Sequence, residues 1–279
     1  MSNACCPGQN QLLAAFPEQE LNRLWKHFDQ VTLSQGELLR QAGSGVQYAC
    51  FPTSALVSGQ YLLENGVSAE FSLIGSDGMV GIAGFLGGGT ASGSALVIAT
   101  GQAWRVRDDL LHEVFERDAG VRLLLLRYAQ ALITQIGQTA VCNRHHTVEQ
   151  QLFRSLLGIL DRSESSEIAM THELLARRLG VRREGVSEAA YKAQTAGLIR
   201  YQRGRITVLD RAGLEARVCE CYRTTKRECA RLVPPLQYAS GCEAQDCASC
   251  AGAQNLDTGI RSRRHPAAVA AGMRLGAAA

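Results

Sequence analysis

The stretch MTHELLARRLGVRREGVSEAAYKAQTAGLIRYQRGRITVL, residues 170–209 of a 279-residue chain, decides the fold of the C-terminal part. Leucines recur at helical spacing in its first third, and Thr171 stands where a helix N-cap is expected. Gly180 then interrupts the pattern, as a tight turn with positive φ requires. A second helix is expected over 182–196, because its small apolar residues share one face that can lie close to the first helix.

The first turns of this second helix are polar on the side that should face solvent. The side chains expected to be exposed there are Arg182, Arg183, Glu184, Ser187 and Glu188. Long polar side chains at the start of such a helix are typical of a recognition helix in the major groove of DNA. Two alternating segments, 198–202 and 205–209, flank the turn Arg203-Gly204 and predict a β-hairpin. A winged helix-turn-helix is therefore favoured over an ordinary helical pair followed by a hairpin.

Positive charge is concentrated around this stretch, although the whole chain carries a formal net charge of only +3. Residues 1–169 hold 11 Lys and Arg against 16 Asp and Glu, a net charge of −5. Residues 170–235 hold 14 against 7, a net charge of +7. A basic segment that coincides with a helix-turn-helix pattern is suited to the phosphate backbone of double-stranded DNA.

The N-terminal part follows a different pattern. Residues 31–106 contain short alternating segments separated by Gly, Ser, Asn and Pro, which predicts an antiparallel β-roll of the jelly-roll or cupin type. Asn65-Gly66 is a strong hairpin signal within it. The predicted fold class is α+β in four parts: a β-roll sensor domain (1–117), a long dimerisation helix (118–146), a winged helix-turn-helix domain (147–235) and a disordered tail (236–279).

The predicted long helix carries a stripe with four- and three-residue spacing, like the a and d positions of a coiled coil. The stripe comprises Leu125, Tyr128, Leu132, Gln135, Thr139 and Cys142. A helix between two domains has few other surfaces that can bury a stripe, so a two-fold partner helix and a homodimer are predicted. The alternative is that the stripe packs on the chain's own β-roll, and both arrangements can hold on different faces.

Several functional classes find no support in the sequence. No apolar segment approaches the roughly 18–20 residues of a membrane span, and the N-terminus lacks the layout of a signal peptide, so a cytoplasmic protein without membrane association is expected. No Ser/His/Asp order or paired-carboxylate motif stands out, so an enzyme is not expected. A cupin-type metal enzyme would need clustered histidines on the strands, and residues 31–106 contain none.

The ten cysteines support an alternative hypothesis, a redox- or metal-responsive regulator. Metal-like spacing occurs in the tail, at Cys242, Cys247 and Cys250, but that set has only three ligands, so no cofactor is predicted. Cys219 and Cys221 are one residue apart on an expected helix, so their side chains should diverge and pack in the core. The adjacent pair His145-His146 should likewise point in different directions.

A β-roll, a long helix and a winged helix-turn-helix together resemble the Crp/Fnr family of bacterial transcription regulators, over about residues 10–235. The most specific part is LLARRLGVRREGVSEAAYKAQTAGLIRYQRGRITVLD, with Ala176, Gly180 and Val186 at the family's small, turn and buried positions. The resemblance implies a homodimeric, sequence-specific transcription regulator that binds double-stranded DNA and contacts RNA polymerase. A regulatory module that binds a ligand but not DNA is the weaker alternative.

The family's base-reading positions fall on the start of the second helix. By that resemblance, Arg183 would donate two hydrogen bonds to a guanine, and Glu184 would accept one from a cytosine amino group. Glu188 departs from the well-known members, which have arginine there, so a different half-site is expected. Arg182 and Ser187 are the remaining candidates for base contacts. The expected phosphate contacts are Thr171, His172, Lys192, Arg203 and Arg205.

The family's effector loop is degenerate in this sequence when it is aligned on Gly81 and Gly84. Ile82 stands where the family has a glutamate for a ribose hydroxyl, and Ser92-Gly93 stand where it has an arginine-serine pair for a cyclic phosphate. The missing arginine removes a charge-assisted contact, so cyclic AMP is not expected to bind. Two further segments, AVCNRHHTVEQQL and GLEARVCECY, resemble a sub-branch of the family to which no effector is assigned, so the effector stays unknown.

Overall fold

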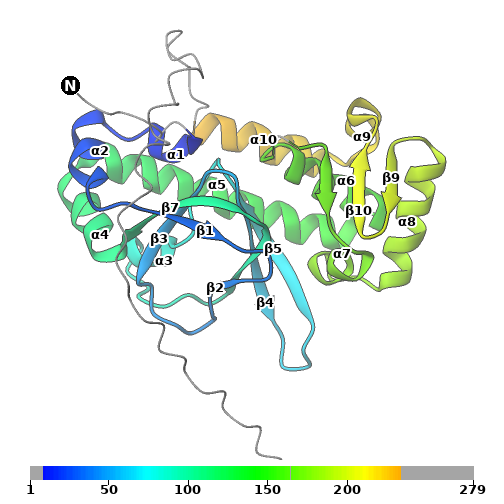
Figure 1. The fold of residues 1–279 in the computed structure, drawn as a ribbon, viewed down its shortest axis with the longest axis horizontal. Helices are drawn as coiled ribbons and strands as arrows, with labels where there is room; N and C mark the ends of the chain where they lie inside the picture. The colour runs from blue at the N-terminus through cyan, green and yellow to red at the C-terminus, as the bar shows by residue number, and fades with distance from the viewer. Residues whose placement is uncertain (1–8, 164, 234–279) are drawn as a thin grey trace, which may run out of the picture. The chain divides into compact units, whose positions relative to one another are not determined.

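A computed structural model describes residues 9–163 and 165–233 of the chain (Figure 1). The predicted tail, 236–279, and its cysteines Cys242, Cys247 and Cys250 lie outside these residues. Among the described helices, none is both long and apolar enough to cross a lipid bilayer.

Two antiparallel sheets form the predicted β-roll. The first has the strand order β1-β7-β3, with strands at Asp29–Leu33, Gly101–Arg107 and Tyr48–Pro52. The second has the order β2-β6-β4-β5, with strands at Leu38–Arg40, Ser94–Ala99, Leu56–Leu62 and Ser68–Ile74. The hairpin turn predicted at Asn65-Gly66 joins β4 to β5, and the φ of 81° at Gly66 favours glycine there.

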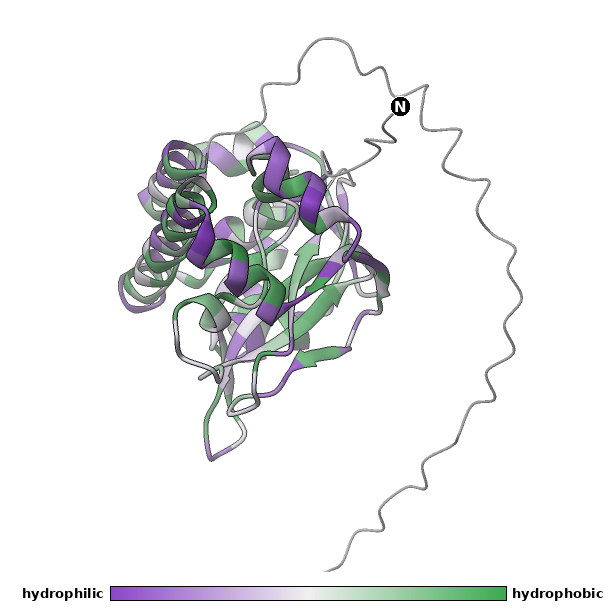
Figure 2. Cartoon of the chain, turned by 90° about the vertical axis from the view of Figure 1, so that its left-hand side faces the viewer, coloured by the Kyte–Doolittle hydropathy of each residue, from purple (hydrophilic) through white to green (hydrophobic). Residues whose placement is uncertain are grey.

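Four short helices flank the β-roll. They are α1, α2, α3 and α4, at Gln11–Ala14, Glu18–Trp25, Ile82–Phe85 and Asp108–Arg117. Their apolar side chains form one core with the first sheet and with the start of α5, and Leu13, Phe51 and Leu125 are completely buried in it. Figure 2 shows hydrophobic and hydrophilic residues alternating along the helices, as expected for amphipathic helices that pack on a core.

The C-terminal part begins with the long helix α5, Ala119–His145, over the predicted range. Helix α6, Val148–Leu160, follows and starts with a capping box formed by Thr147 and Gln150. The remaining elements are β8 (Glu167–Ala169), α7 (His172–Leu179), α8 (Arg183–Thr195), β9 (Ile199–Gln202), β10 (Arg205–Val208), α9 (Arg211–Arg217) and α10 (Glu220–Leu232). Helix α10 runs alongside α5 (Figure 1).

The stripe predicted to form the dimer seam is buried inside the chain. Its six side chains are 0–8 % exposed: Leu125, Tyr128, Leu132, Gln135, Thr139 and Cys142. The Tyr128 hydroxyl donates to the Met79 carbonyl (2.8 Å) and accepts from the Met79 N–H (3.0 Å). The Gln135 amide likewise exchanges two hydrogen bonds with the backbone of Leu73, on the edge strand β5. At its other end, Thr139 accepts a hydrogen bond from Arg154 of α6, and Cys142 is buried in the C-terminal core. The prediction that this stripe contacts a partner helix is therefore wrong, because it is buried within the chain, against the β-roll at Tyr128 and Gln135 and against the C-terminal part at Thr139 and Cys142.

Candidate DNA-binding interface

The helix-turn-helix begins and ends at the residues that the sequence indicates. The Thr171 hydroxyl caps α7 by accepting a hydrogen bond from the Leu174 N–H (3.2 Å). Gly180 ends α7 in the left-handed conformation with a φ of 67°. Helix α8 starts directly after Arg182. The predicted N-cap and turn are confirmed.

Helix α8 has one buried apolar face and one exposed polar face. Val186, Ala189, Ala190 and Ala193 are buried in the core that α8 shares with α6 and α7. The opposite side exposes four of the five predicted base contacts, Arg182, Arg183, Glu184 and Glu188. The small buried residues bring α8 close to its neighbours, while the long polar side chains extend into solvent. This is the arrangement that a recognition helix needs to enter a major groove.

The fifth candidate, Ser187, is half-buried and belongs to a contact among three elements. Its hydroxyl lies 3.0 Å from Nδ1 of His172, at the start of α7. The His172 ring in turn stacks on Tyr201 of β9, with ring centroids 4.0 Å apart. Burial, together with the nearby Arg183, lowers the pKa of His172 below its usual value. A neutral imidazole adds no charge toward a phosphate, so the geometry favours a role in joining α7, α8 and the wing.

The wing is a two-stranded hairpin beside α8 (Figure 1). Gln202 pairs with Arg205 across a two-residue turn, in which Arg203 and Gly204 have φ values of 50° and 76°. Positive φ at both central residues is the type I′ pattern that matches strand twist, and it confirms the predicted turn. A third strand, β8, which the sequence did not indicate, pairs with β10.

Ion pairs already engage some of the predicted contact residues. Glu188 and Lys192, one helical turn apart on α8, form an exposed pair with a 2.8 Å separation. The hydrogen bond from Lys192 lowers the pKa of the Glu188 carboxyl. Arg205 pairs with Glu167 of β8. Exposed pairs of this kind contribute little to stability, so an approaching phosphate can replace them.

A protein-family comparison identifies this part of the chain. Residues 150–217 match the family described as the Crp-like helix-turn-helix domain. These residues form a Crp-like helix-turn-helix domain. Its DNA-binding elements are the ones described above, α7, α8 and the β9–β10 wing.

Solved structures show that the similarity in fold extends beyond this domain, over as much as 77 % of the chain. A transcriptional regulator assigned to the crp/fnr family from Eubacterium rectale superposes with a TM-score of 0.60 at 15 % identity, over 77 % of this chain and 99 % of that one. FixK2 from Bradyrhizobium japonicum superposes with a TM-score of 0.59 at 16 % identity, over 69 % of this chain and 98 % of FixK2. The c-di-GMP responsive global regulator CLP from Xanthomonas campestris superposes with a TM-score of 0.55 at 15 % identity, over 69 % of this chain and 99 % of CLP. The predicted fold class, a β-roll, long helix and winged helix-turn-helix, is confirmed as that of Crp/Fnr regulators.

An ion pair between Arg178 and Glu70, which the sequence did not predict, joins the Crp-like domain to the β-roll. Arg178, on the inner side of α7, is 2 % exposed. Its guanidinium binds both carboxylate oxygens of Glu70 on β5, at 2.7 and 2.8 Å. The Ser58 hydroxyl donates a further hydrogen bond to Glu70 (2.5 Å). Helical spacing offered a signal, because Arg178 follows Leu174 and Leu175 on the apolar side of α7.

The segment predicted to be a degenerate effector loop runs from Gly81 to Gly93, and it is exposed over residues 86–90. Gly81 precedes α3 with a φ of 123°. The Ser92 hydroxyl lies 3.1 Å from that of Tyr61, whose ring packs on Phe71. A Cβ atom at Gly93 would lie 2.7 Å from the Phe71 ring. Ser92 is exposed, whereas the Phe71 ring leaves no space for a side chain at Gly93.

Proposed function

We propose that the protein is a homodimeric transcription regulator that inserts one α8 helix from each subunit into successive major grooves of a two-fold DNA site. The observation that carries the proposal is the polar, exposed start of α8 on a helix whose other face is buried in the Crp-like domain. The net charge of +7 over residues 170–235 supports attraction to the phosphate backbone. RNA polymerase is the further partner that the family resemblance implies.

Two side chains at the start of α8 are the proposed base readers. Arg183 is exposed and, among the described residues, forms no ion pair that would compete with a guanine. Glu184 is exposed beside it and can accept from a cytosine amino group. Glu188, tied to Lys192, is expected to alter the half-site relative to regulators that have arginine there. Thr171 at the start of α7, and Arg203 and Arg205 in the wing, remain the proposed phosphate contacts.

The outer face of α5 supports a dimer seam different from the predicted one. It exposes four apolar side chains, Leu123, Leu126, Ile133 and Val141, at spacings of 3, 7 and 8 residues. Gly137 lies on the same face, and a Cβ atom there would meet nothing within 4 Å. An apolar stripe with small residues lets two helices approach closely, and a two-fold axis would bring the same stripe of a second copy against it. Burial of this stripe in a dimer explains why it is apolar.

Cyclic AMP is not the proposed effector. The degenerate loop lacks the arginine for a cyclic phosphate, and Phe71 packs against Gly93 where that group would sit. These contacts support a regulator whose signal binds at another site, or one that needs no small molecule.

Binding to DNA tests the proposal in two steps. Genomic fragments retained by the purified protein would first define a half-site, and fluorescence anisotropy would then measure affinity on that site and on each single-base variant. We expect Arg183→Ala to cost about 1–3 kcal/mol on the preferred site and to relax specificity at one base pair. The matched control is Arg227→Ala on α10, which removes the same charge from an exposed position remote from α8 in sequence.

Two results would contradict the proposal. Absence of any specific, salt-sensitive binding would overturn the regulator function itself. An Arg183→Ala variant that weakened binding equally on all sequences would leave DNA binding intact but would reduce Arg183 to a phosphate contact.

A further inference from the structure

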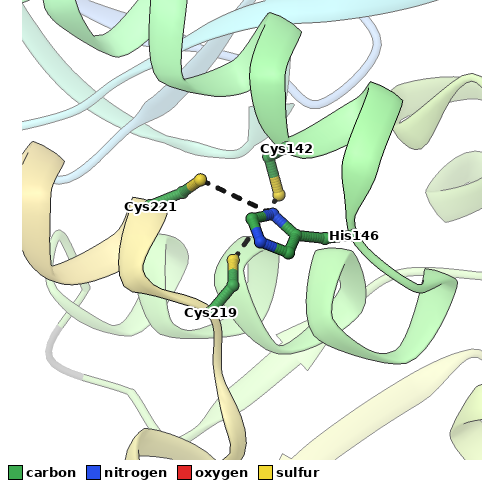
Figure 3. Close-up of side chains that lie close together, drawn as sticks. All are labelled: Cys142, His146, Cys219 and Cys221. Carbon is green, nitrogen blue, oxygen red and sulfur yellow. Dashed lines mark hydrogen bonds between the residues drawn. The ribbon is translucent and has the colours of Figure 1, made fainter.

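Four metal-capable side chains that lie far apart in the sequence meet at the end of α5. They are Cys142 and His146, from the end of the long helix, and Cys219 and Cys221, from the start of α10 (Figure 3). One ligand atom from each lies within 4.8 Å of every other. The Sγ atoms of Cys142 and Cys219 are 3.6 Å apart, and Sγ of Cys221 is 3.6 Å from Nδ1 of His146.

The backbone explains why these side chains converge, contrary to the sequence-based expectation. Cys219 is the N-cap of α10 and has extended φ and ψ values of −70° and 162°, so it lies outside the helix that contains Cys221. His146 is the C-cap of α5, with φ and ψ of −102° and 156°, so its direction is not fixed by the helix. Both the predicted divergence of Cys219 from Cys221 and the helical placement of His146 are therefore wrong.

The spacing of the ligand atoms fits one tetrahedral ion. A zinc ion with Zn–S distances of about 2.3 Å has neighbouring thiolates about 3.8 Å apart at tetrahedral angles. The 3.6 Å separations in the protein need only small adjustments to reach that geometry. An iron–sulfur cluster with several metal atoms would hold its thiolates farther apart. A disulfide between Cys142 and Cys219 would require an S–S distance of about 2.05 Å, whereas both thiols are free.

The surroundings have the character of a closed structural site. Cys142, Cys219 and Cys221 are at most 3 % exposed. Nε2 of His146 lies 3.4 Å from a carboxylate oxygen of Glu220. A carboxylate on one ring nitrogen holds the proton there and leaves the other nitrogen, Nδ1, free as a ligand, which is the usual outer-sphere arrangement of metal-binding histidines.

We propose that Cys142, His146, Cys219 and Cys221 bind one Zn²⁺ ion, which fastens the end of α5 to the start of α10. Three thiolates and one imidazole are a soft ligand set that suits zinc and leaves no open coordination position, so the ion is structural. Binding releases the remaining thiol protons to solvent and changes no oxidation state. All four ligands fall within AVCNRHHTVEQQL and GLEARVCECY, the two segments that the DNA-binding proposal leaves unexplained.

The site would couple the two halves of the proposed regulator. His146 lies two residues before α6, the first helix of the Crp-like domain, and α10 follows α9, its last matched helix. A zinc ion at this point would fix where the domain leaves the long helix. The inference does not depend on DNA binding, because metal content and DNA affinity are measured separately.

Elemental analysis of the full-length protein, purified under reducing conditions without chelators, tests the site. We expect one zinc per chain, and near-complete loss of zinc in Cys142→Ser and in Cys221→Ser. Cys229→Ser, on the same α10 helix but outside the cluster, is the matched control and should keep the zinc. A triple Ser variant of Cys242, Cys247 and Cys250 should also keep it, which separates this site from the candidate cysteines in the tail.

A second measurement guards against variants that fail to fold. Zinc is removed from the folded wild-type protein with a chelator and replaced with Co²⁺, whose tetrahedral thiolate complex absorbs strongly in the visible range. We expect this absorption in the wild type and in His146→Cys, which replaces the imidazole with a fourth thiolate ligand, but not in Cys142→Ser. Metal-free wild-type protein that develops no such absorption, an iron–sulfur spectrum, or zinc that depends on the tail cysteines would each overturn the proposal.

Discussion

The two long faces of α5 contrast in a way that their composition does not suggest. The inner face includes Tyr128, Gln135 and Thr139, which are polar yet buried. The outer face includes Leu126 and Ile133, which are apolar yet 43 % and 60 % exposed. Burial on this helix is thus decided by what each face contacts, and the side chains of the inner face make hydrogen bonds that the outer residues could not make.

The inner polar side chains each satisfy a specific neighbour. Gln135 completes the hydrogen bonding of the edge strand β5, and Tyr128 does the same for Met79 in the loop that follows it. Thr139 accepts from Arg154 of α6 at 3.1 Å. Apolar side chains in place of Tyr128 and Gln135 would leave buried backbone groups unpaired, at about 1–3 kcal/mol for each. The outer apolar face needs no such partners, and in the proposed dimer a second chain would cover it.

The largest expected effect comes from placing charge on the outer face. In the double variant Leu126→Glu with Ile133→Glu, the two-fold axis would bring like charges from both subunits together, and the dimer should become a monomer. Because two linked half-site contacts then become single ones, affinity for the full DNA site should fall by on the order of 10²–10⁴-fold. Light scattering on a sizing column and fluorescence anisotropy measure the two effects.

The control for the outer face is Leu63→Glu, which places a charge at an equally exposed leucine after β4. This variant should leave both the molar mass in solution and the affinity for DNA unchanged. A double variant that stayed dimeric would show that the outer face of α5 is not the seam.

The inner face should respond to the loss of apolar volume instead. Leu125 is completely buried, so Leu125→Ala should lower the free energy of unfolding by about 2–5 kcal/mol through lost burial and the cavity left behind. Urea denaturation measures it. The control is Leu123→Ala on the outer face. It is made in the monomeric double variant, so that no partner covers Leu123. We expect it to change the free energy of unfolding by no more than about 0.5 kcal/mol. Equal losses at the two positions would refute the assignment of the faces.

The contrast between the faces also marks how far the sequence could predict the structure. Signals that act between near neighbours were sufficient: the Thr171 cap, the turn at Gly180 and the Arg203-Gly204 wing each depend on a few adjacent residues. The stripe on α5 was found at the right residues, but its four- and three-residue spacing is equally compatible with a partner helix and with a β-roll. Only the position of β5 decides between them.

The features that the sequence did not reveal all join distant segments. Arg178 binds a glutamate 108 residues earlier, and Cys142 meets Cys219 across 77 residues. Residue types alone gave partial signals, an arginine on an apolar helical face and cysteines beside a histidine. Which residue lies opposite each one depends on how α7 docks on β5 and how α10 returns along α5, and no local pattern encodes either.

The smallest expected effect tests the hydrogen bonds of the inner face without changing its shape. Tyr128→Phe removes one hydroxyl and leaves the Met79 N–H and carbonyl unpaired, which should lower the free energy of unfolding by about 1–3 kcal/mol. Tyr61→Phe, whose hydroxyl contacts Ser92 at the surface, is the control and should change it by less than about 0.5 kcal/mol.

The difference in unfolding free energy between the wild type and Tyr128→Phe should depend on pH. Burial raises the pKa of the Tyr128 hydroxyl above its usual value, because the ionised form would be desolvated. The folded state then holds its proton at a pH where the unfolded state, with a tyrosine pKa of about 10, has lost it. The stabilisation from Tyr128 is fully present below that pH and declines as the pH rises above it. Urea denaturation at pH 8 and above 10 should therefore show the gap between the wild type and Tyr128→Phe narrowing in alkali, and a gap that stayed constant would mean that the hydroxyl is not buried against the β-roll.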